Sequence, residues 1–281
     1  MKRFLRLLRE AAVSAFYNKC FDTAKSAAYS SILSFFPALM VTAAFLSGHV
    51  SAVVDEISIA LGRVLPPDAY EVAEQYLKVQ GARAHGLLAG AWFVAIWSAS
   101  NVISCLIQGF QTAYKVRVNR SLIKSRLVAL ALLPISGVPL LLATLLLFFG
   151  EQVANWLAVH FIEARWWLAP AGMAVRWSVA FATSVFVIGL LYHVGSGRRQ
   201  QWRLVWPGAV LATGAWLGAT LGFAWYVRKM ARYGELYGSI STAVVLLIWM
   251  YIVNLAVIYG CEFNAAYERE LSAAEAPASS G

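Results

Sequence analysis

Long apolar runs and short charged segments alternate along the whole chain. Six of the runs are long enough for a helix to cross a lipid bilayer. They occupy residues 27–50, 87–110, 128–150, 173–194, 204–227 and 238–264. A helix needs about 20 residues to cross about 30 Å of hydrocarbon, and it satisfies its own backbone hydrogen bonds there. The pattern therefore predicts an all-α polytopic membrane protein with six transmembrane helices.

The residues before the first run have a different pattern, because apolar and basic positions recur at helical spacing. The positions that can face lipid are Phe4, Leu5, Leu8 and Ala12, and those that can reach headgroups are Lys2, Arg3, Arg6 and Arg9. This favours an N-terminal amphipathic interfacial helix, with a solvated basic helix as the alternative. We therefore divide the chain into a cytoplasmic N-terminal helix at 1–25, a six-helix transmembrane domain at 26–265 and a disordered cytoplasmic tail at 266–281.

Basic residues are distributed unevenly between alternate loops. Segments 1–25, 111–127, 195–203 and 266–281 carry fifteen of the 23 Lys and Arg residues, and seven lie in the loops of the opposite side. Positively charged loops stay in the cytoplasm, so we expect both termini there. The same excess attracts anionic lipid headgroups. A nucleic-acid groove needs basic and aromatic residues on a soluble face, so we expect membrane lipids as partners and no nucleic acid.

Composition supports the membrane assignment and narrows the chemistry. Only 13% of the residues are charged, against about 25% in a soluble domain. The three cysteines are spaced neither for a disulfide framework nor for a zinc site, and the four histidines are scattered. No Gly-rich phosphate loop or nucleophile elbow appears. We therefore expect no metal, no cofactor and no enzymatic activity.

Two loops on the side opposite the termini are longer than the others. In residues 51–86, Asp68 and Glu71 follow two prolines and form a helix-start pattern, which predicts a helix over 68–79. Residues 151–172 contain three tryptophans, which suit the headgroup layer. Both segments are either lids that lie on the membrane or plain connectors.

Prolines interrupt the first and third runs. Pro37 removes the helical hydrogen bond to Leu33, and the serines at 30, 31 and 34 can satisfy the freed carbonyl. Pro134 and Pro139 have the same effect in the third run. These three prolines are candidate kinks or hinges.

Polar side chains recur on one face of the second run. Trp97, Asn101, Ser104 and Gln108 follow one another at spacings of four, three and four. Amides in hydrocarbon need hydrogen-bond partners, so this face either lines a wet cavity or bonds a neighbouring helix.

The last run contains Asn254 in its inner half and Glu262 near its end. Glu262 either forms an ion pair with Arg198, Arg199 or Arg203, or couples to a moving proton. The candidate polar pathway therefore consists of Asn101, Ser104, Gln108, Asn254 and Glu262.

The fifth run contains Gly214, Gly218 and Gly222, each four residues apart. Small residues at this spacing let another helix approach closely. The partner is either a helix of the same chain or a second copy, so a homo-oligomer is possible.

Two segments resemble a known family. AAYSSILSFFPALM (27–40) and YGSISTAVVLLIWMYIVNLAVIYGCEFNAAYERE (237–270) are similar to the YihY/virulence factor BrkB family of bacterial inner-membrane proteins. The family pattern commonly has Ala at Cys261 and Leu at Phe263, and neither difference changes polar chemistry. The resemblance covers nearly the whole chain. It implies six spans, both termini in the cytoplasm and a bacterial inner membrane, and it supplies no agreed activity.

Two functions fit these features. The first is a transporter or translocase of a lipid or small amphiphilic solute, and the second is a non-catalytic scaffold or regulator of an envelope assembly. The resemblance also brings an old ribonuclease label. Phosphodiester hydrolysis needs clustered carboxylates with metal or a His-based acid–base pair, and the sequence offers neither.

Overall fold

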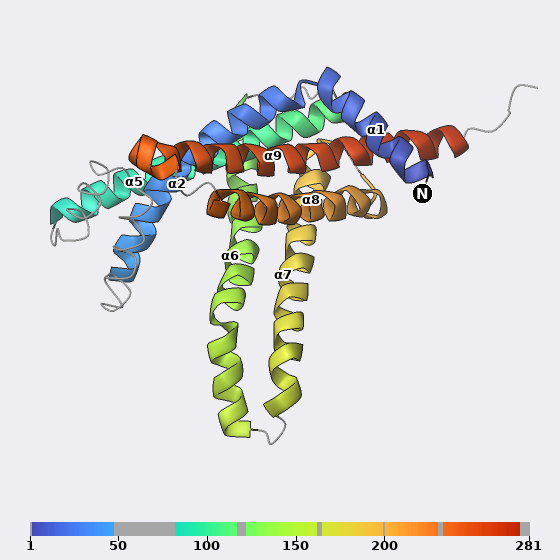
Figure 1. Ribbon diagram of the computed structural model, residues 1–281. Helices are drawn as coiled ribbons and strands as arrows, with labels where there is room; N and C mark the ends of the chain where they lie inside the picture. The colour runs from blue at the N-terminus through green and yellow to red at the C-terminus, as the bar shows by residue number, and fades with distance from the viewer. Residues whose placement is uncertain are drawn as a thin grey trace, which may run out of the picture. The chain divides into compact units, whose positions relative to one another are not determined.

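The computed structural model describes residues 2–47, 82–116, 122–161, 165–198, 200–229 and 233–275. All regular elements in these ranges are helices, so the predicted all-α class is confirmed for them (Figure 1). They are α1 (Lys2–Tyr17), α2 (Cys20–Ser47), α5 (Ala82–Ala113), α6 (Leu122–Phe161), α7 (Arg165–Gly195), α8 (Trp202–Lys229) and α9 (Tyr233–Glu275).

Five of the described helices are long and apolar enough to cross a membrane. Their candidate spans are Ala89–Ala113, Ile123–Leu147, Gly172–Gly195, Trp202–Tyr226 and Ala243–Ala273. Each overlaps one of the six predicted runs. The remaining run, 27–50, falls largely on α2, and its last three residues lie outside the described part of the chain. The total of six spans therefore stays a prediction.

Two helices extend well past the length that a bilayer requires. α6 has 40 residues and α9 has 43, which correspond to about 60 and 65 Å at 1.5 Å per residue. α9 continues to Glu275, so the predicted disorder from residue 266 is wrong for 266–275. The predicted lid or connector at 151–172 is helical up to Phe161 and again from Arg165. The predicted helix at 68–79 lies outside the described residues.

The chain divides into two compact units. One contains Met1–Cys20, Ile107–Ala215 and Ala256–Gly281, and the other contains Phe21–Leu106 and Trp216–Leu255. In the first unit, α6 and α7 pack side by side along their length (Figure 1). We refer to these parts as the first unit and the second unit.

In the first unit, α1 packs lengthwise on the C-terminal part of α9. Leu7 and Ala11 of α1 are buried against Phe263 and Ala266 of α9. Their spacing of four residues places them on one face of the helix. One side of the apolar arc of α1 therefore contacts α9 and is not available to lipid.

The predicted lipid-facing residues divide accordingly. Leu8 is partly buried against the α1–α9 core, and the ring of Phe4 meets Phe263 edge-on at 5.7 Å. Leu5 and Ala12 stay exposed. The exposed part of the arc is suited to lipid, and an interfacial position of α1 stays a prediction.

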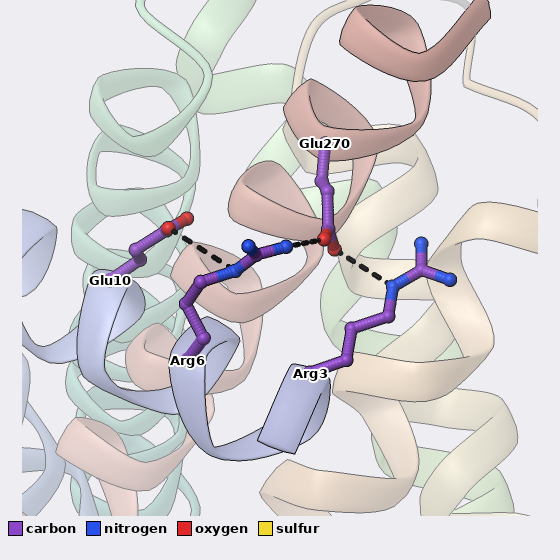
Figure 2. Close-up of polar contacts among 4 residues, drawn as sticks. All are labelled: Arg3, Arg6, Glu10 and Glu270. Atoms are coloured by element: carbon purple, nitrogen blue, oxygen red, sulfur yellow. Dashed lines mark hydrogen bonds and ion pairs between the residues drawn. The ribbon is translucent and has the colours of Figure 1, made fainter. Parts of the chain in front are cut away.

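Ion pairs hold the start of α1 on the end of α9. Glu270 accepts hydrogen bonds from Arg3, at 3.1 Å, and from Arg6, and Arg6 also lies 4.0 Å from Glu10 (Figure 2). The carboxylate of Glu270 thus links Arg3 and Arg6, which lie about one turn apart on α1, to a single position of α9.

We expect Glu270→Gln to loosen α1 while leaving the transmembrane helices folded. Neutralising the carboxylate removes both charge-assisted contacts, and the effect should shrink in high salt because exposed pairs are screened. Hydrogen–deuterium exchange should show faster exchange of the α1 amides. Glu10→Gln is the matched control, because it removes an acid near Arg6 without touching the link to α9. Equal exchange in the two variants would contradict this role of Glu270.

α8 and α9 cross at two isolated glycines in the first unit. A Cβ on Gly208 would overlap the carbonyl oxygen of Gly260 and the side chain of Asn264, and a Cβ on Gly260 would lie 2.6 Å from the hydroxyl oxygen of Tyr192. The two backbones therefore touch without intervening side chains, so any larger residue at either position must push the helices apart.

The predicted glycine ladder of α8 makes no such contact. A Cβ on Gly214, Gly218 or Gly222 would meet no atom within 4 Å in the described structure. The ladder is therefore not packed against a described helix of its own chain. A contact with a second copy stays a prediction.

The three prolines that were expected to kink their helices lie inside continuous helices, Pro37 in α2 and Pro134 and Pro139 in α6. The serines near Pro37 bond other groups than the carbonyl of Leu33. The hydroxyl of Ser31 donates to the Ala27 carbonyl at 2.8 Å, and that of Ser34 donates to the Ser31 carbonyl at 2.9 Å. A hinge at any of these prolines stays a prediction.

Candidate functional site

The carboxyl group of Glu262 is completely buried in the first unit. The side-chain amide of Asn18 donates a hydrogen bond to its Oε1 at 2.6 Å, and the thiol of Cys20 donates to the same oxygen at 3.3 Å. Within the described residues, Oε2 has no hydrogen-bond partner. A buried carboxyl surrounded by neutral donors is costly to maintain, which makes Glu262 the centre of a candidate site.

The predicted ion pair of Glu262 is absent among the described residues. Arg198 pairs with Glu268 instead, and Arg199 lies outside the described part of the chain. Six residues of α9, nearly two turns, separate Glu262 from Glu268, so the arginine meets a carboxylate near the surface while Glu262 faces the interior.

A tight corner between α1 and α2 positions both groups that bond Glu262. The backbone N–H of Asn18 donates to the Ser14 carbonyl at 2.8 Å, and that of Lys19 donates to the Phe16 carbonyl at 3.3 Å. Lys19 has a φ of 54°, a left-handed conformation that interrupts the helix between Tyr17 and Cys20. Asn18 and Cys20 therefore lie on either side of the corner, and both reach Glu262.

The thiol at this corner stays protonated. Burial, together with the negative charge of Glu262, raises the pKa of the Cys20 thiol above its usual range. Cys20 therefore acts as a hydrogen-bond donor and not as a thiolate nucleophile.

Three depressions surround Lys115 in the first unit, and together they form what we call the basic cleft. One of about 570 Å³ is lined by the neutral side chains of Asn18, Gln108, Gln111 and Thr112. One of about 620 Å³ is lined by Arg6, Arg9, Glu10 and Arg269. One of about 320 Å³ is lined by Tyr114, Arg198, Glu268 and Arg269. Lys115 borders all three.

The basic cleft is rich in cations. Five cations line it, and they come from four segments of the chain: Arg6, Arg9, Lys115, Arg198 and Arg269. The lining contains two acids, Glu10 and Glu268. These four segments are the ones that the loop charges assign to a single side of the membrane. The cleft is therefore suited to an anion.

An aromatic contact organises one wall of the cleft. The guanidinium of Arg198 lies over the ring of Tyr114 at 5.1 Å from its centre, a cation–π geometry. Burial raises the pKa of the Tyr114 phenol, so the ring stays neutral beside the Arg198–Glu268 pair.

A hydrogen-bonded layer lies behind the site and connects three helices. Asn264 accepts a hydrogen bond from the Gly208 N–H at 2.7 Å and donates to the Val205 carbonyl at 2.8 Å. The Tyr192 hydroxyl donates to the Val257 carbonyl at 2.5 Å. Because all these groups are buried, they hold α7, α8 and α9 in one register.

The candidate polar pathway is divided between the two units. Gln108 lines the neutral part of the cleft, and Glu262 is one hydrogen bond behind it through Asn18. Asn101, Ser104 and Asn254 belong to the second unit. The structure thus brings together two of the five residues.

The amides of the second unit bond neighbouring helices. Asn101 donates to the hydroxyl of Ser30 at 2.6 Å, and Asn254 donates to that of Ser31 at 3.4 Å and to its own helix at the Met250 carbonyl at 2.8 Å. Ser104 donates to the Ser100 carbonyl at 2.9 Å. These contacts match the helix-bonding alternative more closely than the wet-cavity one.

The residues to which the sequence patterns assign no role in a site are Asn18, Lys115, Gly208 and Asn264. The first two each lie at a corner where a helix ends. The other two lie far apart in the sequence and touch only because α8 and α9 cross.

The fold and the site define a class: a helical protein with several apolar helices of membrane-crossing length and a carboxyl group buried beside a basic cleft. The sequence matches the family described as Virulence factor BrkB over residues 15–280. The chain therefore belongs to the virulence factor BrkB family of membrane proteins.

Curated relatives carry two kinds of name. The chain is 33% identical over 239 residues to the putative ribonuclease-like protein YfkH of Bacillus subtilis, covering 85% of this chain and 86% of that one. It is 25% identical over 259 residues to the UPF0761 membrane protein Smlt0865 of Stenotrophomonas maltophilia, covering 89% of this chain and 58% of that one.

A third relative, a UPF0761 membrane protein of Alkalilimnicola ehrlichii, is 22% identical over 249 residues and is covered over 55% of its length. The chain thus spans somewhat more than half of these two UPF0761 relatives. No solved structure matches.

The ribonuclease-like name belongs to the Bacillus relative. In the described part of this chain, no group of three or more His, Cys, Asp or Glu side chains could hold a metal ion. The absence of enzymatic activity stays a prediction.

Proposed function

We propose that this chain is a transporter or translocase of a lipid or small amphiphilic solute in a bacterial inner membrane, with both termini in the cytoplasm. The carrying observation is the buried carboxyl of Glu262, which is one hydrogen bond from the neutral depression that Asn18 and Gln108 line. Ionisable residues buried in a membrane protein commonly mark a pathway for substrate or protons. Among the described residues, Glu262 is the candidate for proton coupling.

The contacts support one order of steps along the proposed pathway. A polar group enters at the basic cleft, passes the amides of Gln108 and Asn18, and then meets Glu262. Displacing Asn18 from Oε1 would leave the carboxyl group with the Cys20 thiol as its one donor, because Oε2 has no partner among the described residues. Binding of a polar group and exposure of Glu262 are thus coupled through a single side chain.

Reconstitution into liposomes tests this function. We expect the purified protein to accelerate movement of fluorescent lipid between leaflets, or uptake of an amphiphilic solute under an imposed proton gradient. Glu262→Gln keeps the size of the side chain and removes its charge. We expect it to slow the movement by about tenfold or more, which corresponds to about 1.4 kcal/mol of barrier.

Asp22→Asn is the matched control, because Asp22 is an exposed acid that pairs with Lys25 on the surface. It should leave the rate unchanged. Should neither lipid nor solute move under any gradient, although the protein is folded and inserted, the transport proposal is wrong.

The second candidate function is a scaffold or regulator of an envelope assembly. The open face along Gly214, Gly218 and Gly222 favours it, because a helix face shaped for close contact has no described neighbour. Gly218→Leu separates the two functions. A scaffold should lose its assembly in cross-linking experiments, whereas a self-sufficient translocase should keep its rate.

A further inference from the structure

Lys115 has a backbone conformation that lysine adopts reluctantly. Its φ is 53°, in the left-handed region where the Cβ of an L-residue is crowded. Its N–H donates to the Thr112 carbonyl at 3.0 Å, and the N–H of Val116 donates to the Gln111 carbonyl at 2.9 Å. This is the helix-terminating pattern in which glycine is the usual residue. A lysine here costs stability that a glycine would not.

The side chain of Lys115 is at the centre of the basic cleft. It borders all three depressions, and among the described residues no acid lies within ion-pair distance of it. A cation at a helix C-terminus also stabilises the helix dipole. A lysine one turn earlier would do so without the strained backbone, so the dipole does not explain this position.

Some of the cations around Lys115 are paired with acids, and others are not. Arg6 is bound to Glu270, and Arg198 is bound to Glu268. In the described part of the chain, Arg9 and Lys115 have no acid within ion-pair distance, and Arg269 donates one side-chain hydrogen bond, to the hydroxyl of Ser14 at 3.4 Å. Three cations from α1, α9 and the end of α5 therefore keep their donors available on one depression of about 620 Å³.

We propose that the basic cleft is a binding site for a phosphate ester, with Lys115, Arg9 and Arg269 as the residues that contact the phosphate oxygens. Guanidinium and ammonium groups are the donors that proteins use for phosphate. The inference rests on the proposed function, because it takes the bound ester to be the head of the transported amphiphile.

The neutral depression gives the site a second part. Asn18, Gln111 and Thr112 line it beside Lys115, and their amide and hydroxyl groups match the hydroxyls of a polyol headgroup such as glycerol. A headgroup whose phosphate is at Lys115 would place its polyol next to Asn18. The occupant is therefore an anionic glycerol phosphate group and not a zwitterionic one, because a choline ammonium in the neutral depression would lie beside Lys115 and would meet no acid among the residues that line it.

Binding to the purified full-length protein in a neutral detergent tests the proposal. The probes are inorganic phosphate, glycerol 3-phosphate, and short-chain phosphatidylglycerol and phosphatidylcholine below their micelle concentrations. We expect the two glycerol phosphates to bind and phosphatidylcholine not to bind. Equal affinity for both glycerol phosphates indicates recognition of a free ester, and preference for phosphatidylglycerol indicates a lipid headgroup.

Lys115→Gly separates binding from stability, because it removes the ammonium and relieves the strained backbone together. We expect it to weaken glycerol phosphate binding by about tenfold, the effect of losing about 1.4 kcal/mol. At the same time the thermal midpoint without ligand should rise. Lys115→Arg should retain binding.

The chain contains a matched control. Lys19 is an exposed lysine with almost the same φ, 54°, and it does not border any of the three depressions. Lys19→Gly removes the same charge and the same backbone strain, and glycine keeps the left-handed corner that positions Asn18, so it should leave the affinity unchanged.

Equal weakening by the two glycine variants would show that only the general charge of this surface matters, and it would overturn the site. So would binding of phosphatidylcholine as tight as that of phosphatidylglycerol, or no binding of any phosphate. The measurement does not depend on transport. Bound glycerol phosphate in a protein that moves no lipid would leave this site standing and remove the proposed function.

Discussion

Gly208→Ala should destabilise the protein by about 3 kcal/mol. The added Cβ has no free space, because it would overlap the carbonyl oxygen of Gly260 and the side chain of Asn264. Backbone atoms cannot rotate away as a flexible side chain would, so α8 and α9 must separate along their contact. Overpacking of this kind costs about 1–3 kcal/mol, and loss of the adjacent hydrogen bonds adds to it. Thermal unfolding in detergent measures the effect.

The ladder on the same helix supplies the control for Gly208→Ala. Gly214→Ala adds the same methyl group where no atom lies within 4 Å, and alanine favours a helix over glycine by about 1 kcal/mol. We expect no loss of stability there. If both variants unfold at the same temperature, the close crossing of α8 and α9 does not exist as described.

Asn264→Leu should cost about 1–3 kcal/mol and shift the position of α8. The two side chains are similar in size, so the change removes polar contacts with little change of volume. It breaks the bonds to the Gly208 N–H and the Val205 carbonyl, both between helices. A buried bond of this kind is worth about 0.5–2 kcal/mol in a membrane protein, and the partners left behind add a desolvation cost.

Thr213→Val is the control for Asn264→Leu. Thr213 is also completely buried, but its hydroxyl donates to the Ala209 carbonyl of its own helix, at 2.9 Å. Losing this local bond should cost less than about 1 kcal/mol, because the carbonyl keeps its helical partner. A larger loss for Thr213→Val than for Asn264→Leu would show that Asn264 does not tie α8 to α9.

The apolar runs predict the helices well but not where the helices end. Hydropathy reports only the part of a helix that suits hydrocarbon. The last turns of α6, up to Phe161, mix Glu151, Asn155 and two Trp or Phe side chains with aliphatic ones. Such a mixture predicts a surface segment, although these residues continue α6. The same limit applies from residue 266. The polar residues there predict a disordered tail, although α9 continues to Glu275.

The sequence indicates Glu262 as a candidate site residue, but it does not indicate which side chains bond it. A carboxyl near the end of an apolar run is conspicuous, and charge alone suggests an arginine as its partner. The actual donor, Asn18, lies 244 residues earlier in the chain. It reaches Glu262 through a corner whose left-handed residue is a lysine, and no glycine marks the turn. Nothing in the local pattern at residues 17–20 indicates such a contact.

The glycines show a similar limit. The regular spacing of Gly214, Gly218 and Gly222 predicts a packing face on the helix, but it does not identify the helix that packs against that face. The close crossing uses Gly208 and Gly260, which are single glycines in different helices. Only the three-dimensional path of α8 and α9 brings them together.

The contact between Asn18 and Glu262 also sets an order for biogenesis. A ribosome adds about 5–20 residues per second, so the 244 residues between them take roughly 12–50 s to synthesise. During that interval α1 lacks its packing surface, because Leu7 and Ala11 pack on Phe263 and Ala266 of α9. The contact between Asn18 and Glu262 therefore forms only after α9 has been synthesised.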